Sequence, residues 1–176
     1  ERALFRPILP EDEPQLRTFI SQVTKEDLYY RYFSEINEFT HDDLANMTQI
    51  DYDREMALLA VIQRDGQDLL IGTARYIDNF DDQSCEFAVV LGDAFQGLGL
   101  ASYLMRRLMQ VAADKGIRVM KGIVLAENKR MIEFCRHLGF TIQRDPEDFG
   151  QVIACGTPEE IRAHPAVIDA YLGDAA

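Results

Sequence analysis

The segment from residue 89 to residue 110 constrains the fold more than any other part of the chain. It begins as an apolar run of the strand type, passes through Gly92 and Asp93, and reaches a turn that contains Gly97 and Gly99. After the turn, apolar residues recur at the i, i+3, i+4 and i+7 positions of an amphipathic helix: Ala101, Leu104, Met105, Leu108, Val111 and Ala112. We therefore predict a strand, a glycine-containing turn and a helix of about four turns.

The glycines of this turn favour an anion-binding site. Side chains do not cover the first N–H groups of a helix that begins with glycine, and the positive end of the helix dipole lies there too. A phosphate or pyrophosphate suits such a position. The alternative is a plain strand-to-helix connection, in which Gly97 and Gly99 serve only to turn the chain.

Two common glycine-rich phosphate motifs do not fit this turn. A dinucleotide-binding G-x-G-x-x-G motif would need glycine at Ser102, an opening β-α-β unit and an acidic residue about 20 positions further on. A P-loop would need Gly-Lys followed by Ser or Thr, a combination that is absent from the whole sequence.

A family signature does fit. The turn Gln96-Gly97-Leu98-Gly99-Leu100-Ala101 resembles the (Arg/Gln)-x-x-Gly-x-(Gly/Ala) signature of the GNAT superfamily of CoA-dependent N-acyltransferases. The resemblance implies acetyl-CoA as co-substrate and no metal. It implies that the pyrophosphate is held by the backbone amides of Gln96, Gly97, Leu98, Gly99, Leu100 and Ala101. It also implies that the pantetheine arm pairs with Ala88, Val89, Val90 and Leu91, and that an amide near Val90 faces the thioester oxygen.

Length, charge and cysteine content limit the classes of function. A chain of 176 residues suits one domain. The net charge of −12 argues against a nucleic-acid partner, whose phosphates it would repel, and is compatible with a basic, lysine-bearing partner. Three cysteines (Cys85, Cys135 and Cys155) form no C-x-x-C pair, which favours a reducing compartment. No secretion signal or apolar run of membrane-spanning length is visible, so we expect a cytoplasmic protein without a membrane partner.

The rest of the chain predicts a mixed α/β (α+β) fold. Strands are expected at residues 4–9, 56–62, 69–76, 85–91, 119–125, 140–143 and 152–155, and helices at 11–22, 25–33, 41–49, 101–112, 128–138 and 159–172. Thr24, with Asp27 three residues on, resembles a capping box for the helix at 25–33, and Thr40 is the expected N-cap of the helix at 41–49. Asp65-Gly66 signals a hairpin, and a strand–helix–strand crossover implies a parallel pair. We therefore expect the GNAT fold, a central, mostly antiparallel twisted sheet with one parallel pair at the CoA-binding β-α-β unit, flanked by helices.

The helix at residues 25–33 is rich in aromatic residues: Tyr29, Tyr30, Tyr32 and Phe33. We expect it to pack into the core. The alternative is that it forms a wall of the cleft for the acceptor substrate, and one helix can do both.

Three other stretches resemble a particular branch of the family. Arg6-Pro7-Ile8, residues 48–57 and Glu86-Phe87-Ala88-Val89 are similar to the acetyltransferase domain of bacterial Pat-type protein lysine acetyltransferases. This resemblance implies a lysine-bearing protein substrate, with an acyl-CoA synthetase as a candidate. We expect residues 1–155 to form the acetyltransferase domain. We expect residues 156–176 to form an atypical helical tail, which resembles the end of the ATP-binding subunits of branched-chain amino-acid transporters. Because the sequence has no P-loop, we do not infer ATPase activity from this resemblance.

Glu86 is the leading candidate for the general base. A carboxylate in an otherwise apolar strand is costly unless it is paired or used, and Pat-type enzymes carry their catalytic glutamate at this place in the motif. Glu55 is the reserve candidate. An outward-facing strand residue without a chemical role is the alternative for Glu86. Asn128 begins the second helix of the family's CoA face, so it either contacts acetyl-CoA or only caps that helix.

Cys135 stands seven residues after Asn128, where many GNAT enzymes carry a tyrosine as general acid. We therefore expect the leaving thiolate to take its proton from water or from the substrate. A cysteine nucleophile is disfavoured, because His137 is the only histidine at a relevant spacing.

These observations favour acetyl transfer from acetyl-CoA to a protein lysine by direct attack in a ternary complex. One alternative is a GNAT enzyme that acetylates a small-molecule amine. The other is a non-catalytic acyl-CoA sensor, which the cysteine at residue 135 favours.

Overall fold

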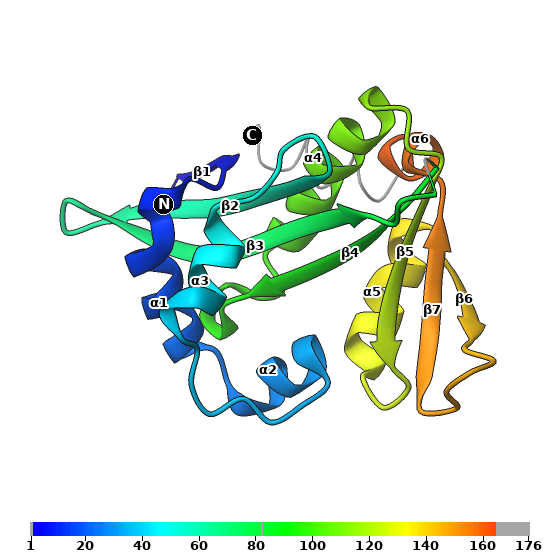
Figure 1. The fold of residues 1–176 in the computed structure, drawn as a ribbon, viewed down its shortest axis with the longest axis horizontal. Helices are drawn as coiled ribbons and strands as arrows, with labels where there is room; N and C mark the ends of the chain where they lie inside the picture. The colour runs from blue at the N-terminus through cyan, green and yellow to red at the C-terminus, as the bar shows by residue number, and fades with distance from the viewer. Residues whose placement is uncertain (1, 82, 165–176) are drawn as a thin grey trace.

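The computed structural model describes residues 2–81 and 83–164, which form a twisted sheet with helices on both faces (Figure 1). The seven strands of this described part make one sheet in the order β1-β2-β3-β4-β5-β7-β6. Neighbouring strands are antiparallel, except that β4 and β5 are parallel. The strands are β1 Ala3–Pro7, β2 Glu55–Arg64, β3 Gln67–Asp78, β4 Ser84–Leu91, β5 Val119–Leu125, β6 Thr141–Arg144 and β7 Gln151–Gly156. The mixed fold with one parallel pair is confirmed.

Helices pack on both faces of the sheet and form two apolar cores. A first apolar core joins the sheet to α4 and α5, and a second core joins it to α1 and α3. The longest of the six described α-helices is α4, which spans 15 residues, and its face of i, i+3, i+4 residues is buried as the sequence predicts. The helices are α1 Glu13–Gln22, α2 Lys25–Tyr32, α3 His41–Thr48, α4 Leu100–Asp114, α5 Lys129–Leu138 and α6 Pro158–Arg162.

Strand β2 contributes to both cores. Leu58, Ala60 and Ile62 belong to the core with α4, and the alternating residues Ala57, Leu59 and Val61 belong to the core with α1 and α3. The run from residue 57 to residue 62 is therefore apolar without interruption, because both of its faces are covered.

Local signals in the sequence place the ends of several elements. The side chains of Thr24, Thr40 and Asn128 each accept a hydrogen bond from a backbone N–H in the first turn of α2, α3 and α5. Asp65 and Gly66 adopt φ angles of 53° and 75°, which a tight hairpin of the right-handed twist requires. The predicted caps and the β2–β3 hairpin are confirmed.

The gap between β4 and β5 is the feature that positions the site. The two parallel strands pair only through Ser84 with Val119, Cys85 with Met120, and Glu86 with Lys121. Beyond Glu86, β5 pairs only with β7, and β4 keeps only β3 as a partner. The edge of β4 from Phe87 to Leu91 is therefore left without a strand on the β5 side, and the two strands diverge there (Figure 1).

The described part of the C-terminal segment packs on the domain. Helix α6 buries Pro158 and Ile161, and Arg162 lies 3.6 Å from Asp114 of α4 in an ion pair. The predicted helix at 159–172 is observed as α6, which ends at Arg162, and residues 165–176 lie outside the described residues. No helix of the described residues is long and apolar enough to cross a membrane. The division of the chain at residue 156 stays a prediction.

Candidate active site

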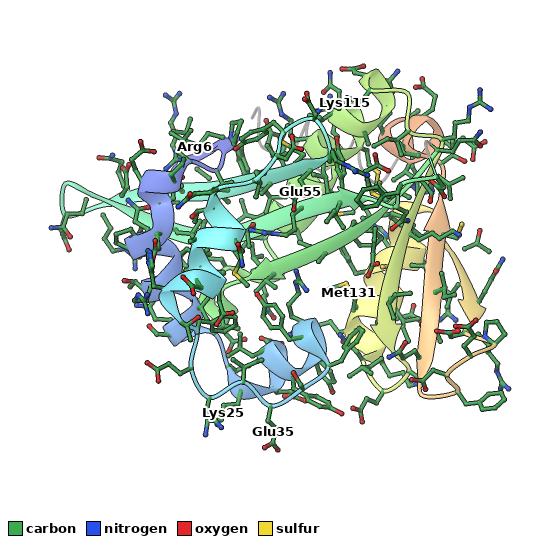
Figure 2. The ribbon with its side chains drawn as sticks, viewed as in Figure 1. Arg6, Lys25, Glu35, Glu55, Lys115 and Met131 are labelled. Carbon is green, nitrogen blue, oxygen red and sulfur yellow. The ribbon has the colours of Figure 1, made fainter. Side chains whose placement is uncertain are left out.

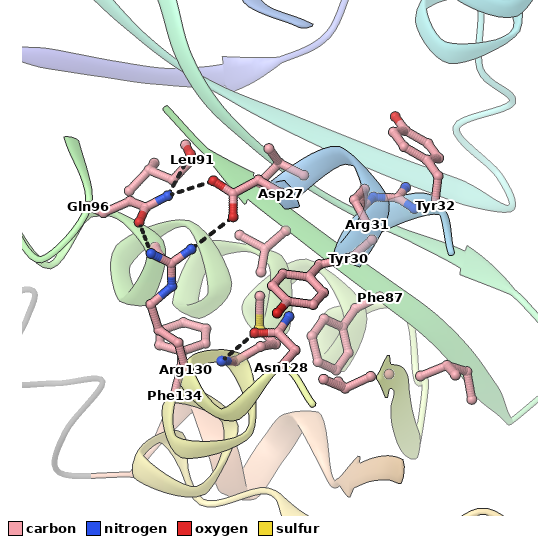
Figure 3. A pocket seen from close by; sticks show the side chains of 18 of the residues that line it. Asp27, Tyr30, Arg31, Tyr32, Phe87, Leu91, Gln96, Asn128, Arg130 and Phe134 are labelled. Carbon is pink, nitrogen blue, oxygen red and sulfur yellow. Dashed lines mark hydrogen bonds and ion pairs between the residues drawn. The ribbon is translucent and has the colours of Figure 1, made fainter. Parts of the chain in front are cut away.

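A large cavity of about 460 Å³ opens where β4 and β5 diverge (Figure 3). Its walls come from α2, from the unpaired edge of β4, from β5 and from the first turns of α4 and α5. Most of the residues predicted to contact acetyl-CoA line this cavity: Ala88, Val89, Val90, Leu91, Gln96, Gly97, Ala101 and Asn128. Leu98, Gly99 and Leu100 complete the turn without lining the cavity itself.

The turn between β4 and α4 has the geometry of an anion cradle. Gly97 and Gly99 adopt φ angles of 77° and 83°, which side chains disfavour. A Cβ atom at either glycine would meet nothing within 4 Å, so the space in front of the turn is open. Gly99 is the N-cap of α4 and offers no side-chain cap, so the first N–H groups of that helix are left for another acceptor. The cradle from Gln96 to Ala101 therefore fits a pyrophosphate.

Three side chains form a bridge across the cavity beside this cradle (Figure 3). The Gln96 amide donates to the carbonyl of Leu91 at 3.2 Å and to Asp27 Oδ2 at 3.4 Å. The Arg130 guanidinium donates to Asp27 Oδ1 at 2.9 Å and also to the Gln96 side-chain oxygen. We name this group the Asp27–Gln96–Arg130 bridge. The sequence did not predict it, because Asp27 and Arg130 are 103 residues apart and lie on different helices.

Helix α2 is a wall of the cavity. It has no buried residue, and Tyr30, Tyr32 and the adjoining Phe33 line the large cavity together with Asp27. Leu28 of α2 also packs, partly buried, against the core formed with α1 and α3, so this helix combines a limited core contact with its role as a cavity wall. Thr24 caps α2, but the Asp27 side chain points to Arg130 and does not complete a capping box.

Glu86 lies on β4 at the last residue that pairs with β5. Its side chain is exposed, so the burial cost that we inferred from the apolar strand does not apply. The alternation of β4 explains this exposure, since Phe87 and Val89 turn into the core whereas Glu86 turns away from it. Glu86 nonetheless borders the large cavity.

A small cavity of about 280 Å³ adjoins the large one. The two share Arg31, Glu86, Phe87 and Ala88. Glu55, the reserve base, lines only the small cavity. Glu55 lies on β2, and Met131 lies on the α5 side of the large cavity (Figure 2).

Asn128 and Cys135, both on the α5 side, differ in their access to the cavity. The Asn128 side chain caps α5 by accepting from the Met131 N–H at 3.2 Å, and it also lines the cavity. Cys135 is fully buried in the apolar core, and this burial raises the pKa of its thiol to about 12. Because the thiolate is the nucleophilic form, Cys135 is poorly suited to attack a thioester. In residues 2–81 and 83–164 there is no cluster of histidine, cysteine and acidic residues that could hold a metal ion.

Comparison with known proteins agrees with this geometry. The profile of the acetyltransferase (GNAT) family matches residues 24–140, well over half of the chain. The chain belongs to the GNAT acetyltransferase family. Members of this family use acetyl-CoA as the acetyl donor, so the protein is an acetyl-CoA-dependent N-acetyltransferase. The family and the fold predicted from the turn at residues 96–101 are confirmed.

Two curated relatives and one solved structure illustrate the similarity. The acetyltransferase PA5475 of Pseudomonas aeruginosa is 39% identical over 150 residues, which cover 85% of this chain and 81% of that protein. The acetyltransferase Pat of Mycolicibacterium smegmatis is 28% identical over 149 residues, 84% of this chain but only 43% of Pat. The GNAT domain of S. lividans PAT superposes with a TM-score of 0.80 at 31% identity, covering 88% of this chain and 90% of that domain.

A second profile matches the end of this GNAT chain. It describes a branched-chain amino acid ATP-binding cassette transporter and covers residues 151–176. The first residues of this match are β7, which pairs with β5 and β6 inside the acetyltransferase sheet. Strand β7 therefore completes the GNAT sheet of this protein, whatever the origin of its sequence.

Proposed function

We propose that this GNAT enzyme transfers an acetyl group from acetyl-CoA to the ε-amine of lysines in protein substrates, by direct attack in a ternary complex. The observation that carries the proposal is the position of Glu86. Glu86 lies on β4, the strand that leads into the cradle. It borders both cavities. An amine that enters through the small cavity would therefore meet Glu86 at the boundary with the large cavity.

The large cavity would hold acetyl-CoA. The cradle amides from Gln96 to Ala101 would bind the pyrophosphate, and the unpaired edge of β4 would pair with the pantetheine arm. Acetyl-CoA supplies the acetyl group as an activated thioester. A backbone amide near Val90 would face the thioester oxygen and stabilise the negative charge that it gains. Asn128 would contact the cofactor from the start of α5.

Glu86 would remove the proton of the acceptor ammonium, directly or through a water molecule. Its exposure lets the proton pass on to solvent. Glu55 is the reserve base, since it lines the small cavity two strands away. Because Cys135 is buried away from the cavities, the leaving thiolate would take its proton from water or from the substrate.

Three observations support a protein acceptor. The sequence resembles the Pat-type protein lysine acetyltransferases, the exposed Glu86 is accessible to a lysine on a protein surface, and the net charge of −12 suits a lysine-bearing partner. By the same resemblance, an acyl-CoA synthetase is a candidate substrate, and the three free cysteines suit the cytoplasm. We assign the reaction to the acetyltransferase domain, residues 1–155.

A small-molecule amine is the second candidate for the acceptor, favoured by the modest volume of the small cavity, about 280 Å³. The test incubates the protein with acetyl-CoA and either lysine-bearing proteins or a panel of small amines. Mass spectrometry then locates the added acetyl group. We expect it on protein lysines. Acetylation of small amines alone would contradict a protein acceptor, and binding of acetyl-CoA without any turnover would favour an acyl-CoA sensor.

A further inference from the structure

The small cavity contains two positively charged side chains that the reaction itself does not require. Arg75 of β3 and Arg31 of α2 both line it. Glu55 and Glu86 line the same cavity, so its wall carries two guanidinium groups and two carboxylates.

Strand pairing fixes how these groups are arranged. Glu55 pairs with Ile77, and Ile77 pairs with Glu86, so the two carboxylates lie on one face of the sheet with Ile77 between them. Their Cα atoms are therefore about 10 Å apart, two strand spacings. Arg75 pairs with Ala57 and Ala88 in the adjacent row of the same face, about 7 Å further along the strands.

The two guanidinium groups lack a carboxylate partner. Arg75 donates one hydrogen bond to the Met47 carbonyl at 3.1 Å, and Arg31 lies 4.6 Å from the centre of the Tyr32 ring. Within residues 2–81 and 83–164, neither forms an ion pair. Burial lowers the pKa of Arg75 and the positive charge of Arg31 lowers it further, whereas the negative charge of Glu55 raises it. Because neither guanidinium group directly contacts a carboxylate of the described residues, each keeps N–H donors for an anion that enters the cavity.

This anion is not a phosphate of acetyl-CoA. Arg75, unlike Arg31, does not line the large cavity, and its pairing partner Ala88 precedes the cradle by eight residues of the chain. The cation beside the cradle is instead Arg130, in the Asp27–Gln96–Arg130 bridge. A dianionic phosphate on the acceptor would also be repelled by Glu55 and Glu86 more strongly than a single carboxylate would be.

We propose that the acetyl acceptor carries a carboxylate close to its amine, which Arg31 and Arg75 bind while Glu86 and Glu55 receive the amine. This inference rests on the proposed function, because it assigns the small cavity to the acceptor. The carboxylate has two potential sources. It belongs either to an Asp or Glu residue beside the target lysine in a protein, or to the α-carboxylate of a free amino acid.

Paired acceptors test the proposal. One pair of lysine peptides differs only by Glu or Gln on each side of the lysine, and the other pair is free lysine and lysinamide. With the wild-type protein, the acceptor that has the carboxylate should show a kcat/KM about tenfold higher in at least one pair, because a charge-assisted hydrogen bond is stronger than a neutral one. A preference within the peptide pair would indicate a carboxylate from a neighbouring protein residue. A preference for free lysine over lysinamide would indicate the α-carboxylate of a free amino acid.

Variants assign the preference to the two arginines. Arg31→Gln and Arg75→Gln should each reduce the ratio of kcat/KM between the carboxylate-bearing acceptor and its neutral twin toward one. Arg75→Lys keeps the positive charge and should retain part of the preference for the carboxylate. It provides a second test at this position if Arg75→Gln folds poorly. Arg136→Gln is the matched control, because Arg136 is exposed and pairs with Glu133 on α5.

A binding measurement keeps the inference testable without turnover. Calorimetry compares the Kd values of Glu-flanked and Gln-flanked acetyl-lysine peptides in the presence of CoA. If no amine is acetylated, the proposed function fails, and this Kd ratio alone decides whether the anion site exists. Equal affinities together with equal kcat/KM in both pairs would overturn it. So would an Arg75→Gln variant that loses affinity for acetyl-CoA while its acceptor preference persists.

Discussion

The cradle and the small cavity differ in how their polar groups are supplied. The cradle is one contiguous turn, residues 96–101, whose binding groups are backbone amides at the start of α4. The small cavity is assembled from α2, β2, β3 and β4, and its charged groups are all side chains. In our proposal, the cofactor that family members share is bound by backbone, whereas the acceptor is bound by side chains that single substitutions can change.

The largest effect should come from Glu86, which lies between the two regions. Glu86→Gln should lower kcat by about 10²–10⁴-fold, the usual contribution of a general base, while acetyl-CoA affinity changes little. The loss should shrink at high pH, where more of the acceptor amine is already neutral. Turnover across pH and cofactor calorimetry measure both effects.

Glu133→Gln is the control for this substitution, because Glu133 is exposed on α5 and bonds to Arg136. An unchanged kcat in Glu86→Gln would transfer the base to Glu55 or to solvent.

Gly99→Val tests whether the cradle acts through its backbone. Valine disfavours the φ of 83° by about 1–2 kcal/mol, and its side chain would occupy the open space in front of the turn. We expect acetyl-CoA affinity to fall at least about tenfold, which corresponds to 1.4 kcal/mol.

Gly116→Val is a matched control for this prediction. Gly116 has a φ of 79° and equally open surroundings, but it follows the far end of α4. Both variants should lose similar stability in thermal unfolding, and only the Gly99 variant should lose affinity. Unchanged affinity in a folded Gly99→Val protein would refute the assignment of the cradle.

Asp27→Asn tests whether side chains, as well as backbone amides, affect the affinity of the cradle for acetyl-CoA. Removing this carboxylate frees Arg130 and removes a negative charge near the expected pyrophosphate. Since a partly exposed pair is worth about 0.2–1 kcal/mol, acetyl-CoA should bind more tightly by a factor between about 1.4 and about 5.

Asp43→Asn controls for the loss of a charge in the first turn of a helix, because Asp43 holds the same place in α3. Weaker cofactor binding in the Asp27 variant alone would mean that the bridge supports the site instead of competing with the cofactor.

The smallest effect on turnover should come from Cys135→Ala. The thiol is buried in the core and lines neither cavity, so kcat should stay within about twofold, while stability falls by about 1 kcal/mol. Steady-state kinetics and denaturant unfolding measure the two quantities. A large loss of kcat in a folded variant would place Cys135 in the chemistry.

The sequence by itself predicted most elements of the described fold and the cradle. The strand, turn and helix around residues 89–110, the helix caps at Thr24, Thr40 and Asn128, and the Asp65-Gly66 hairpin are all visible locally. They depend on interactions within a few residues, such as side-chain periodicity, a capping hydroxyl or a positive φ, which a short stretch of sequence encodes.

Only the tertiary structure decided what surrounds the cradle. It turned the aromatic helix α2 toward the gap between β4 and β5, and it left Glu86 exposed on an otherwise apolar strand. It joined Asp27 to Arg130, 103 residues away, and it placed Arg31 beside Arg75 in one cavity. These contacts follow from strand register and from the point at which β4 and β5 cease to pair, and both are properties of the assembled sheet that no local pattern records.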